Sequence, residues 1–383
     1  MPNSFGLYVH IPFCSKKCPY CDFNSYATSK QEVESVESRY IDSLLKEAKN
    51  YQKDWGREEI ESIFLGGGTP SLFSAESIRK LLNGIRDLYK IKAAAEVTME
   101  ANPGSIYEPL FQEKLKNFKQ AGINRISLGC QSFTNQKLQF LGRIHSAEQS
   151  IQAIENVKSA GFENFNIDLI FGVQDESLEQ WLLDLNTAIA LNPKHISAYA
   201  LTIEPGTDFG KLTKKGSVLI GDDSVVSECY VKTQETLEQA GYLQYEVSNY
   251  AQKNNECRHN LIYWSYKNYL GLGAGAHSFK DNKRWINSLR PEQYTQQVNE
   301  SGHARQREEK ISEAQANLEI IYTCLRKASG IESKRFENLA GVQKEIGVLV
   351  NERLLVVEGG CVRLSRKGFL FSDYVVERLC GGL

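Results

Sequence analysis

Short apolar runs alternate with longer amphipathic stretches over the first 205 residues of the chain. The runs are rich in β-branched and aromatic residues and end near Gly, Asn or Pro, which is typical of strands. Six strands are predicted, at residues 5–12, 61–66, 96–101, 124–130, 164–171 and 195–203. Because helical patterns lie between these strands, the order indicates successive βαβ units and a parallel sheet.

The stretches between the strands place apolar residues at helical spacing. In the helix predicted over 31–52, for example, Val33, Tyr40 and Leu44 share one face. Ser74 is the predicted N-cap of a second helix. Further helices are predicted over 108–121, 146–160 and 176–191. Six strands with helices between them predict an α/β fold, a partial (β/α)6 barrel similar to an incomplete TIM barrel.

The rhythm changes after Pro205. We expect a helix at 222–240, an irregular aromatic-rich segment at 242–270 and a glycine-rich run at 271–278. Helical patterns at 311–328 and 341–352 then precede an alternating run at 356–364, which predicts a hairpin. Three parts are therefore predicted: a partial barrel over 1–220, an intervening segment over 221–305, and a small winged-helix-like module over 306–383.

Composition and charge narrow the class of protein. The 383 residues hold 45 Lys and Arg against 47 Asp and Glu, a net charge of −2, so no overall basic field attracts nucleic acid. The first residues lack the basic region of a secretory signal, and no stretch reaches the roughly 18 apolar residues of a membrane span. We expect a cytoplasmic protein with at most transient membrane association.

Three of the nine cysteines fall within the first 21 residues, directly after the first predicted strand. Cys14, Cys18 and Cys21 thus lie where active-site loops collect in parallel barrels. Structural zinc needs four ligands, which this loop lacks, whereas an iron–sulfur cube held by three thiolates keeps one iron open. The alternative is three incidental cysteines, which their close spacing disfavours. The neighbouring Lys16 and Lys17 favour the thiolate form.

Residues 14–21, CSKKCPYC, resemble the CxxxCxxC motif of the radical S-adenosylmethionine superfamily. The resemblance implies that Cys14, Cys18 and Cys21 hold a [4Fe-4S] cluster whose open iron binds S-adenosylmethionine. It also implies a partial barrel of the radical S-adenosylmethionine type. In this superfamily the cluster cleaves the cofactor to an adenosyl radical, while the protein supplies orientation and excludes water and oxygen.

Polar residues at the other strand ends agree with this interpretation. Consecutive glycines, as in Gly66-Gly67-Gly68-Thr69-Pro70, let a ligand approach the backbone closely. Further polar residues at or near strand ends are Glu100, Gln131, Arg143 and Asp168. Singly, each fits a turn or an ordinary surface position. Together they predict a pocket for an amino acid moiety, a ribose and an adenine.

These positions also match the branch of the superfamily that includes oxygen-independent coproporphyrinogen III oxidase, over nearly the whole chain. By this resemblance, the segment Gly66 to Pro70 contacts the methionine moiety of S-adenosylmethionine. The candidates for binding its nucleoside are Tyr8, Tyr20, Glu100, Gln131, Arg143 and Asp168, with Thr202 a weaker one. His10 either faces the pocket or is satisfied by hydrogen bonds in the core.

Two features separate the sequence from the oxidase. The cluster motif begins at Cys14, without the longer N-terminal extension of the oxidase, and Phe23 stands where the oxidase carries an additional cysteine. Both features resemble the haem chaperones of the same branch.

Residues 258–264, RHNLIYW, fit the HNxxYW haem-binding motif of these chaperones. A neutral imidazole such as that of His259 is a good ligand for haem iron, and Tyr263 and Trp264 offer flat apolar surface. Arg258 can pair with a propionate. Outside the resemblance, a histidine beside two aromatic residues fits a packed structural element equally well. The alternative haem ligands are His277 and Cys257.

The sequence therefore favours a haem chaperone that binds haem, the cluster and S-adenosylmethionine, and that delivers haem to respiratory cytochromes or oxidases. The resemblance also suggests a homodimer. Two alternatives stay open: a coproporphyrinogen III oxidase, and a radical enzyme acting on an unrelated small substrate. We expect no coproporphyrinogen oxidase activity.

Overall fold

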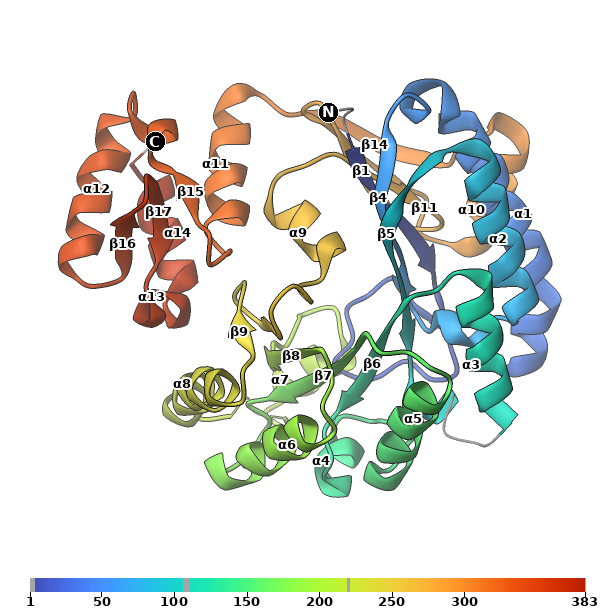
Figure 1. Cartoon of the computed structure of the whole chain (residues 1–383), viewed down its shortest axis with the longest axis horizontal. Coiled ribbons are helices and arrows are strands. Elements are labelled where there is room, and N and C mark those ends of the chain that lie inside the picture. Colours follow the sequence, from blue (N-terminus) through green and yellow to red (C-terminus); the bar gives the residue numbers. More distant parts are fainter. Residues whose placement is uncertain (1–3, 106–109, 219–220, 383) are drawn as a thin grey trace.

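Six parallel strands form the centre of one curved sheet, as the hydrophobic pattern predicts (Figure 1). The structure is a computed structural model and describes residues 4–105, 110–218 and 221–382. The six strands are β1 (Ser4–Ile11), β4 (Glu59–Gly67), β5 (Lys90–Ala101), β6 (Arg125–Gln131), β7 (Phe165–Phe171) and β8 (His195–Ala200). They pair in chain order, which gives the predicted partial barrel.

The two faces of this sheet differ in chemistry because side chains alternate along each strand. In β1, Phe5, Leu7 and Val9 are fully buried and belong to the main core under the helices. The alternate residues Tyr8 and His10 face the concave interior of the barrel. The concave face thus carries the polar residues, and the convex face carries the apolar ones.

Helices cover the convex face, and their N-caps follow from local sequence. Ser74 is confirmed as an N-cap, since its side chain accepts a hydrogen bond from the backbone N–H of Ser77 at 3.1 Å. The helix predicted over 108–121 is observed from residue 110, and residues 108 and 109 lie outside the described part. These helices are α1 (Lys30–Trp55), α2 (Ala75–Leu88), α3 (Leu110–Ala121), α4 (Asn135–Phe140), α5 (Ala147–Ser159) and α6 (Leu178–Ala190).

The chain after residue 205 extends both edges of the sheet. At the β8 edge it adds β10 (Asn249–Ala251) and β9 (Leu243–Gln244). At the β1 edge it adds β11 (Tyr269–Leu272), β12 (His277–Lys280), β13 (Lys283–Asn287) and β14 (Arg305–Lys310). The expectation that 242–270 is irregular is therefore wrong in part. These strands are short, and polar ones such as β14, RQREEK, lack the apolar alternation that reveals a strand.

Four helices accompany these added strands. They are α7 (Asp208–Thr213), α8 (Asp223–Gln239), α9 (Arg258–Trp264) and α10 (Pro291–Ser301). Figure 1 shows α9 on the concave side, between the sheet and the C-terminal part of the chain. There Gly6 of β1 leaves room for α9, because a Cβ on Gly6 would lie 2.6 Å from the side chain of Ile262.

The C-terminal part is a small module with its own apolar core, at one side of the sheet (Figure 1). Its elements are α11 (Glu313–Cys324), β15 (Ile331–Glu332), η3 (Ser333–Phe336), α12 (Ala340–Asn351), β16 (Leu355–Glu358), β17 (Cys361–Leu364), α13 (Arg366–Leu370) and α14 (Ser372–Cys380). The predicted hairpin is confirmed as β16 and β17, which pair antiparallel.

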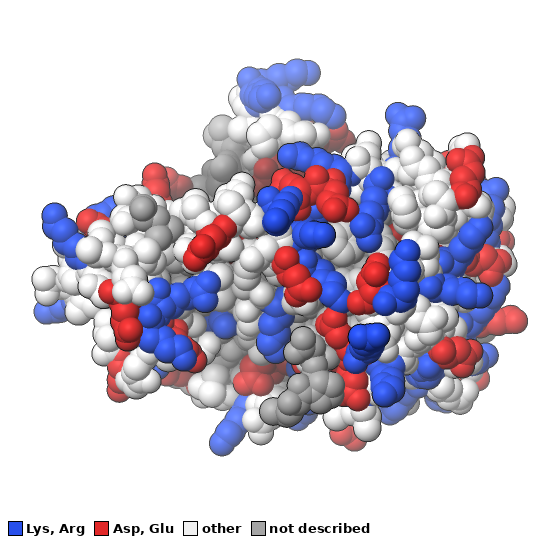
Figure 2. All heavy atoms as spheres, turned by 90° about the horizontal axis from the view of Figure 1, so that it is seen from above, with Lys and Arg blue, Asp and Glu red and all other residues white. Residues whose placement is uncertain are grey.

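The surface agrees with the balanced composition. Figure 2 shows basic and acidic side chains interspersed over one face, with no extended field of one sign. Within the described ranges, no helix has both the length and the apolar character that a membrane crossing requires.

Candidate functional site

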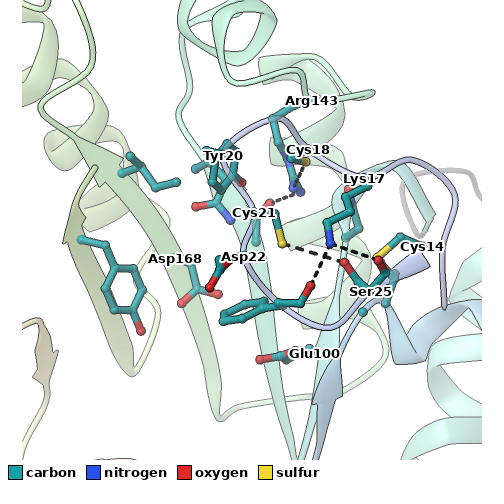
Figure 3. Close-up of a pocket in the computed structure, with 18 of the residues that line it drawn as sticks. Cys14, Lys17, Cys18, Tyr20, Cys21, Asp22, Ser25, Glu100, Arg143 and Asp168 are labelled. Atoms are coloured by element: carbon teal, nitrogen blue, oxygen red, sulfur yellow. Dashed lines mark hydrogen bonds between the residues drawn. The ribbon is translucent and has the colours of Figure 1, made fainter. Parts of the chain in front are cut away.

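The carboxyl ends of the parallel strands open into a cavity of about 410 Å³, lined by the cysteine loop on one side and by strand ends on the other. Figure 3 shows this pocket with Glu100 and Asp168 projecting from strands beneath the loop. Its lining includes most of the predicted residues: Cys14, Cys18, Tyr20, Cys21, Gly67, Gly68, Thr69, Glu100, Gln131, Arg143, Asp168 and Thr202. The structure therefore brings residues from seven separate segments to one site.

A small two-strand ladder shapes the cysteine loop. Strands β2 (Phe13–Cys14) and β3 (Tyr26–Ala27) pair in parallel, so the residues between them form a closed loop over the barrel. Within it, the backbone N–H of Cys21 donates to the carbonyl oxygen of Cys18 at 3.1 Å. The hydroxyl of Thr69, on the GGGTP segment, lies 3.6 Å from the Cys14 sulfur. The loop is thus held at both ends and faces the glycine segment.

Electrostatics around the thiols follow the sequence expectation only in part. Burial raises the pKa of the Cys14 and Cys21 thiols. Lys17 turns its ammonium group to the carbonyl oxygens of Phe23 (3.0 Å) and Ser25 (3.2 Å), so it does not hydrogen-bond to a sulfur. The cation at a sulfur is instead Arg143, whose Nη1 lies 3.3 Å from the Sγ of Cys18. The charge of Lys17 does lower the pKa of Cys21, as predicted, but burial outweighs it. Arg143 is a further cation at the cysteine loop that the sequence did not indicate.

The donor set fits an iron–sulfur cluster. All three cysteines are free and partly exposed to the cavity. Among the described residues, no three Cys, His, Asp or Glu side chains converge on one metal ion. A cube does not need such convergence, because each thiolate reaches a different iron. Because the pKa of two of the thiols is raised, we expect cluster binding to release protons from them.

The glycine segment requires glycine at a defined position. Gly67 has φ of +104°, and a Cβ there would lie 2.3 Å from the His10 ring. His10 is 5% exposed, and its ring accepts from the Tyr8 hydroxyl (2.9 Å) and donates to the carbonyl oxygen of Asn24 (2.8 Å). His10 therefore holds the end of the cysteine loop through Asn24. Of its two predicted roles, the structure shows a histidine whose hydrogen bonds are satisfied in the core.

Two carboxyl groups face the cavity from neighbouring parts of the sheet. Burial, followed by the charge of Asp168, raises the pKa of Glu100 to about 8. Its Oε2 accepts a hydrogen bond from the backbone N–H of Gly67 at 3.0 Å. Asp168 accepts from Ser127 at 3.2 Å and from Asn166 at 2.8 Å. Near neutral pH Glu100 is largely protonated, so it can donate to a ligand hydroxyl or ionise beside a ligand ammonium group.

Arg143 offers the counter-charge that an anionic ligand group needs. Its Nη2 donates to the carbonyl oxygen of Gly129 at 2.7 Å, while its buried Nε has no partner among the described residues. Gln131, which ends β6, has φ of +70°, a left-handed conformation that is uncommon outside glycine. The side-chain amide of Gln131 can donate and accept hydrogen bonds, and the guanidinium group of Arg143 can donate them. This rim of the cavity therefore offers a ligand both donors and acceptors.

Several predicted residues lie beside the cavity wall, and several lining residues were not predicted. Tyr8 lies deeper in the barrel against Phe64, and Gly66 lies behind Glu100.

The lining residues that sequence reasoning missed include Ser25, Asn102, Ser127, Gly129 and Tyr199. Ser127 and Gly129 had a usable signal, because they precede Gln131 at alternate positions of the same strand.

Comparison with known proteins decides the family. The family model described as Radical SAM superfamily matches residues 8–185. The chain is 36% identical to the heme chaperone HemW of Haemophilus influenzae, over 97% of each chain. It is also 36% identical to the heme chaperone HemW of Bacillus subtilis, over 99% of this chain and 100% of the relative. This chain belongs to the HemW family of the radical SAM superfamily. The predicted resemblance is confirmed.

A solved structure extends this result to the fold. Coproporphyrinogen III oxidase (HemN) from Escherichia coli, a radical SAM enzyme, superimposes with a TM-score of 0.83 over 100% of this chain and 91% of the other. The two sequences are 22% identical, so this match shows the shared fold alone. The predicted fold class is confirmed, and the HemW-family chain carries the radical SAM partial barrel.

The HNxxYW segment of this HemW-family chain forms α9, which packs against β1 and β4 on the concave side of the sheet. His259 is 1% exposed; its Nδ1 lies 2.8 Å from the Ser62 hydroxyl and its Nε2 lies 2.9 Å from the Tyr263 hydroxyl. Burial lowers the pKa of His259 to about 3, so the ring is neutral. Both ring nitrogens are engaged, and the described conformation leaves neither of them free for haem iron.

The two alternative ligands differ in access. Cys257 is fully buried, and its sulfur donates to Glu96 at 3.5 Å. His277 is exposed at the start of β12. In this conformation His277 is therefore more accessible than His259.

Proposed function

We propose that this chain is a haem chaperone that binds a [4Fe-4S] cluster, S-adenosylmethionine and haem, and that passes haem to haem proteins such as respiratory cytochromes or oxidases. The observation that carries the proposal is the similarity to HemW relatives over 97% or more of the chain. It is supported by the cavity that joins three free thiols to Arg143, Glu100 and Asp168. We place the protein in the cytoplasm, as its cysteine usage suggests.

The residues of the cavity suggest how the cofactors are held. Cys14, Cys18 and Cys21 would ligate the cluster, which when reduced would supply one electron to bound S-adenosylmethionine. Arg143 would pair with the ligand carboxylate through its unpartnered Nε, and Glu100 would ionise beside the ligand ammonium group. Asp168, at the deeper end, would accept from ribose hydroxyls.

The oxidase remains the second candidate because it shares the fold. Phe23 argues against it, since this side chain is 65% exposed at the cavity where the oxidase branch carries an additional cysteine. Conversion of coproporphyrinogen III in the presence of reductant and S-adenosylmethionine would support the oxidase instead. A homodimer and the identity of the recipient protein are part of the chaperone proposal.

Haem titration of two histidine variants tests the proposal and identifies the iron ligand. We expect His277→Ala to lose the absorption spectrum of imidazole-ligated haem, because His277 is exposed whereas both ring nitrogens of His259 are engaged. His259→Ala is the matched control and is expected to keep that spectrum. The spectrum would be recorded during anaerobic titration of the reconstituted protein.

Two other outcomes would contradict this assignment. A spectrum lost only in His259→Ala would show that α9 leaves the barrel and that His259 is the ligand. A parent protein that binds no haem at all would contradict the chaperone proposal itself.

A further inference from the structure

A second cavity, of about 330 Å³, lies at the seam between the sheet and the C-terminal module. We call it the seam cavity. It is lined by Tyr199 of β8, the β9–β10 turn, α9, and the first residues after α11. The lining residues are Tyr199, Glu246, Val247, Ser248, Asn249, Asn260, Tyr263, Trp264 and Arg326. Four separate segments of the chain therefore contribute to one pocket.

The seam cavity combines aromatic rings with a single cation. Tyr199 is 39% exposed there, and Tyr263 and Trp264 contribute further ring surface. The guanidinium group of Arg326 lies 6.0 Å from the centre of the Trp264 ring and 4.7 Å from that of Tyr322. Flat apolar surface beside a guanidinium group suits a planar ligand that carries carboxylates.

Arg326 has capacity for such a ligand. Its side chain is 16% exposed, and its Nε is buried without a partner among the described residues. Its Nη2 pairs with Asp373 at 2.5 Å, but the Asp373 side chain is 83% exposed, so water screens this ion pair and the pair is weak. A carboxylate entering the cavity can displace Asp373 and form a forked pair with the guanidinium group.

The remaining acid of the seam cavity does not prevent this. Glu246 is 1% exposed, and burial raises its pKa to about 7. The raised pKa favours the neutral form of Glu246, which reduces repulsion of an incoming carboxylate.

The position of the seam cavity links it to the cofactor site. Tyr199 lines both cavities, so the two adjoin at this side chain. The volume lies at the low end of the range for small-molecule sites, which suits one edge of a tetrapyrrole rather than the whole macrocycle.

We propose that the seam cavity binds the propionate edge of haem, with Arg326 of the C-terminal module pairing with a propionate and Trp264, Tyr263 and Tyr199 contacting the porphyrin. This inference rests on the proposed haem function and adds a residue from the module to it. The module then has a role in holding haem as well as in covering the sheet.

Anaerobic titration with haem and with haem dimethyl ester, whose propionates are blocked, tests the proposal. We expect Arg326→Ala to weaken haem binding about tenfold to a hundredfold, the range of a charge-assisted hydrogen bond. The parent protein should bind haem dimethyl ester more weakly than haem, by a similar factor. Arg326→Ala should bind the two ligands with nearly equal affinity, because the propionate has lost its partner. Asp373→Ala should tighten haem binding about twofold to fivefold, because it frees Arg326.

Arg366→Ala is the matched control. It removes another arginine of the module and its 3.0 Å ion pair with Glu238 of α8, but Arg366 does not line the seam cavity. Its haem affinity should equal that of the parent. A parent that binds haem while Arg326→Ala and Asp373→Ala both match it would overturn this inference alone. A parent that binds no haem would overturn the proposed function and the inference together.

Discussion

Replacement of Cys18 by alanine is expected to abolish the iron–sulfur cluster. Cys18 is the middle cysteine of the loop, and its sulfur lies 3.3 Å from Nη1 of Arg143. A cube held by three protein thiolates has no spare ligand on the loop, so the loss of one leaves two irons without protein ligands. Iron and sulfide content and the visible absorbance after anaerobic reconstitution measure the effect.

Cys361→Ala is the control for this experiment. Cys361 is also a free, partly exposed cysteine, but it lies in β17 of the C-terminal module. This variant should keep the full cluster. Full iron and sulfide content in Cys18→Ala would refute the assignment of the cluster ligands.

Replacement of Lys137 by methionine is expected to lower the free energy of unfolding by about 3–5 kcal/mol, the cost of leaving buried carboxylates without their cation. Lys137 of α4 is 7% exposed and pairs with Glu176 and with Asp184, the latter at 3.1 Å. The two carboxylates also accept backbone N–H groups of the loops that follow β6 and β7. The variant should therefore destabilise the rim of the cofactor cavity as well.

Urea denaturation, followed by far-ultraviolet circular dichroism, measures this loss. Lys211→Met is the matched control, because Lys211 pairs with Asp208 at 2.8 Å on the surface of α7, where both side chains are well exposed. Its effect should stay below about 1 kcal/mol. Equal, small effects of the two variants would show that the buried network does not stabilise the fold as described.

The centre of the fold could be predicted because its signals are local. The six parallel strands are continuous apolar runs bounded by breakers, and the N-cap at Ser74 is a short-range pattern. The cofactor cavity follows from topology, since the carboxyl ends of parallel strands meet at one edge. Glu100 and Asp168 could therefore be placed together although 68 positions separate them in the sequence.

The remaining features depend on contacts that no local pattern encodes. His259 follows the spacing of a haem motif, but the structure turns its ring toward Ser62, 197 residues earlier. The polar strand β14 forms only because β13 lies beside it. Arg326 has no distinctive sequence context and becomes a candidate ligand-binding residue only when the module brings it to Trp264. In each case tertiary packing, rather than sequence periodicity, decides where the side chain points.

Haem transfer tests the central claim most directly. Haem-loaded protein would be mixed with the apo form of a b-type respiratory haem protein, the two would be separated, and the haem in each fraction would be measured over time. A haem chaperone predicts that haem moves to the recipient faster than it does from haem-loaded serum albumin. Haem that stays with the chain, or that moves no faster than from albumin, would contradict the account.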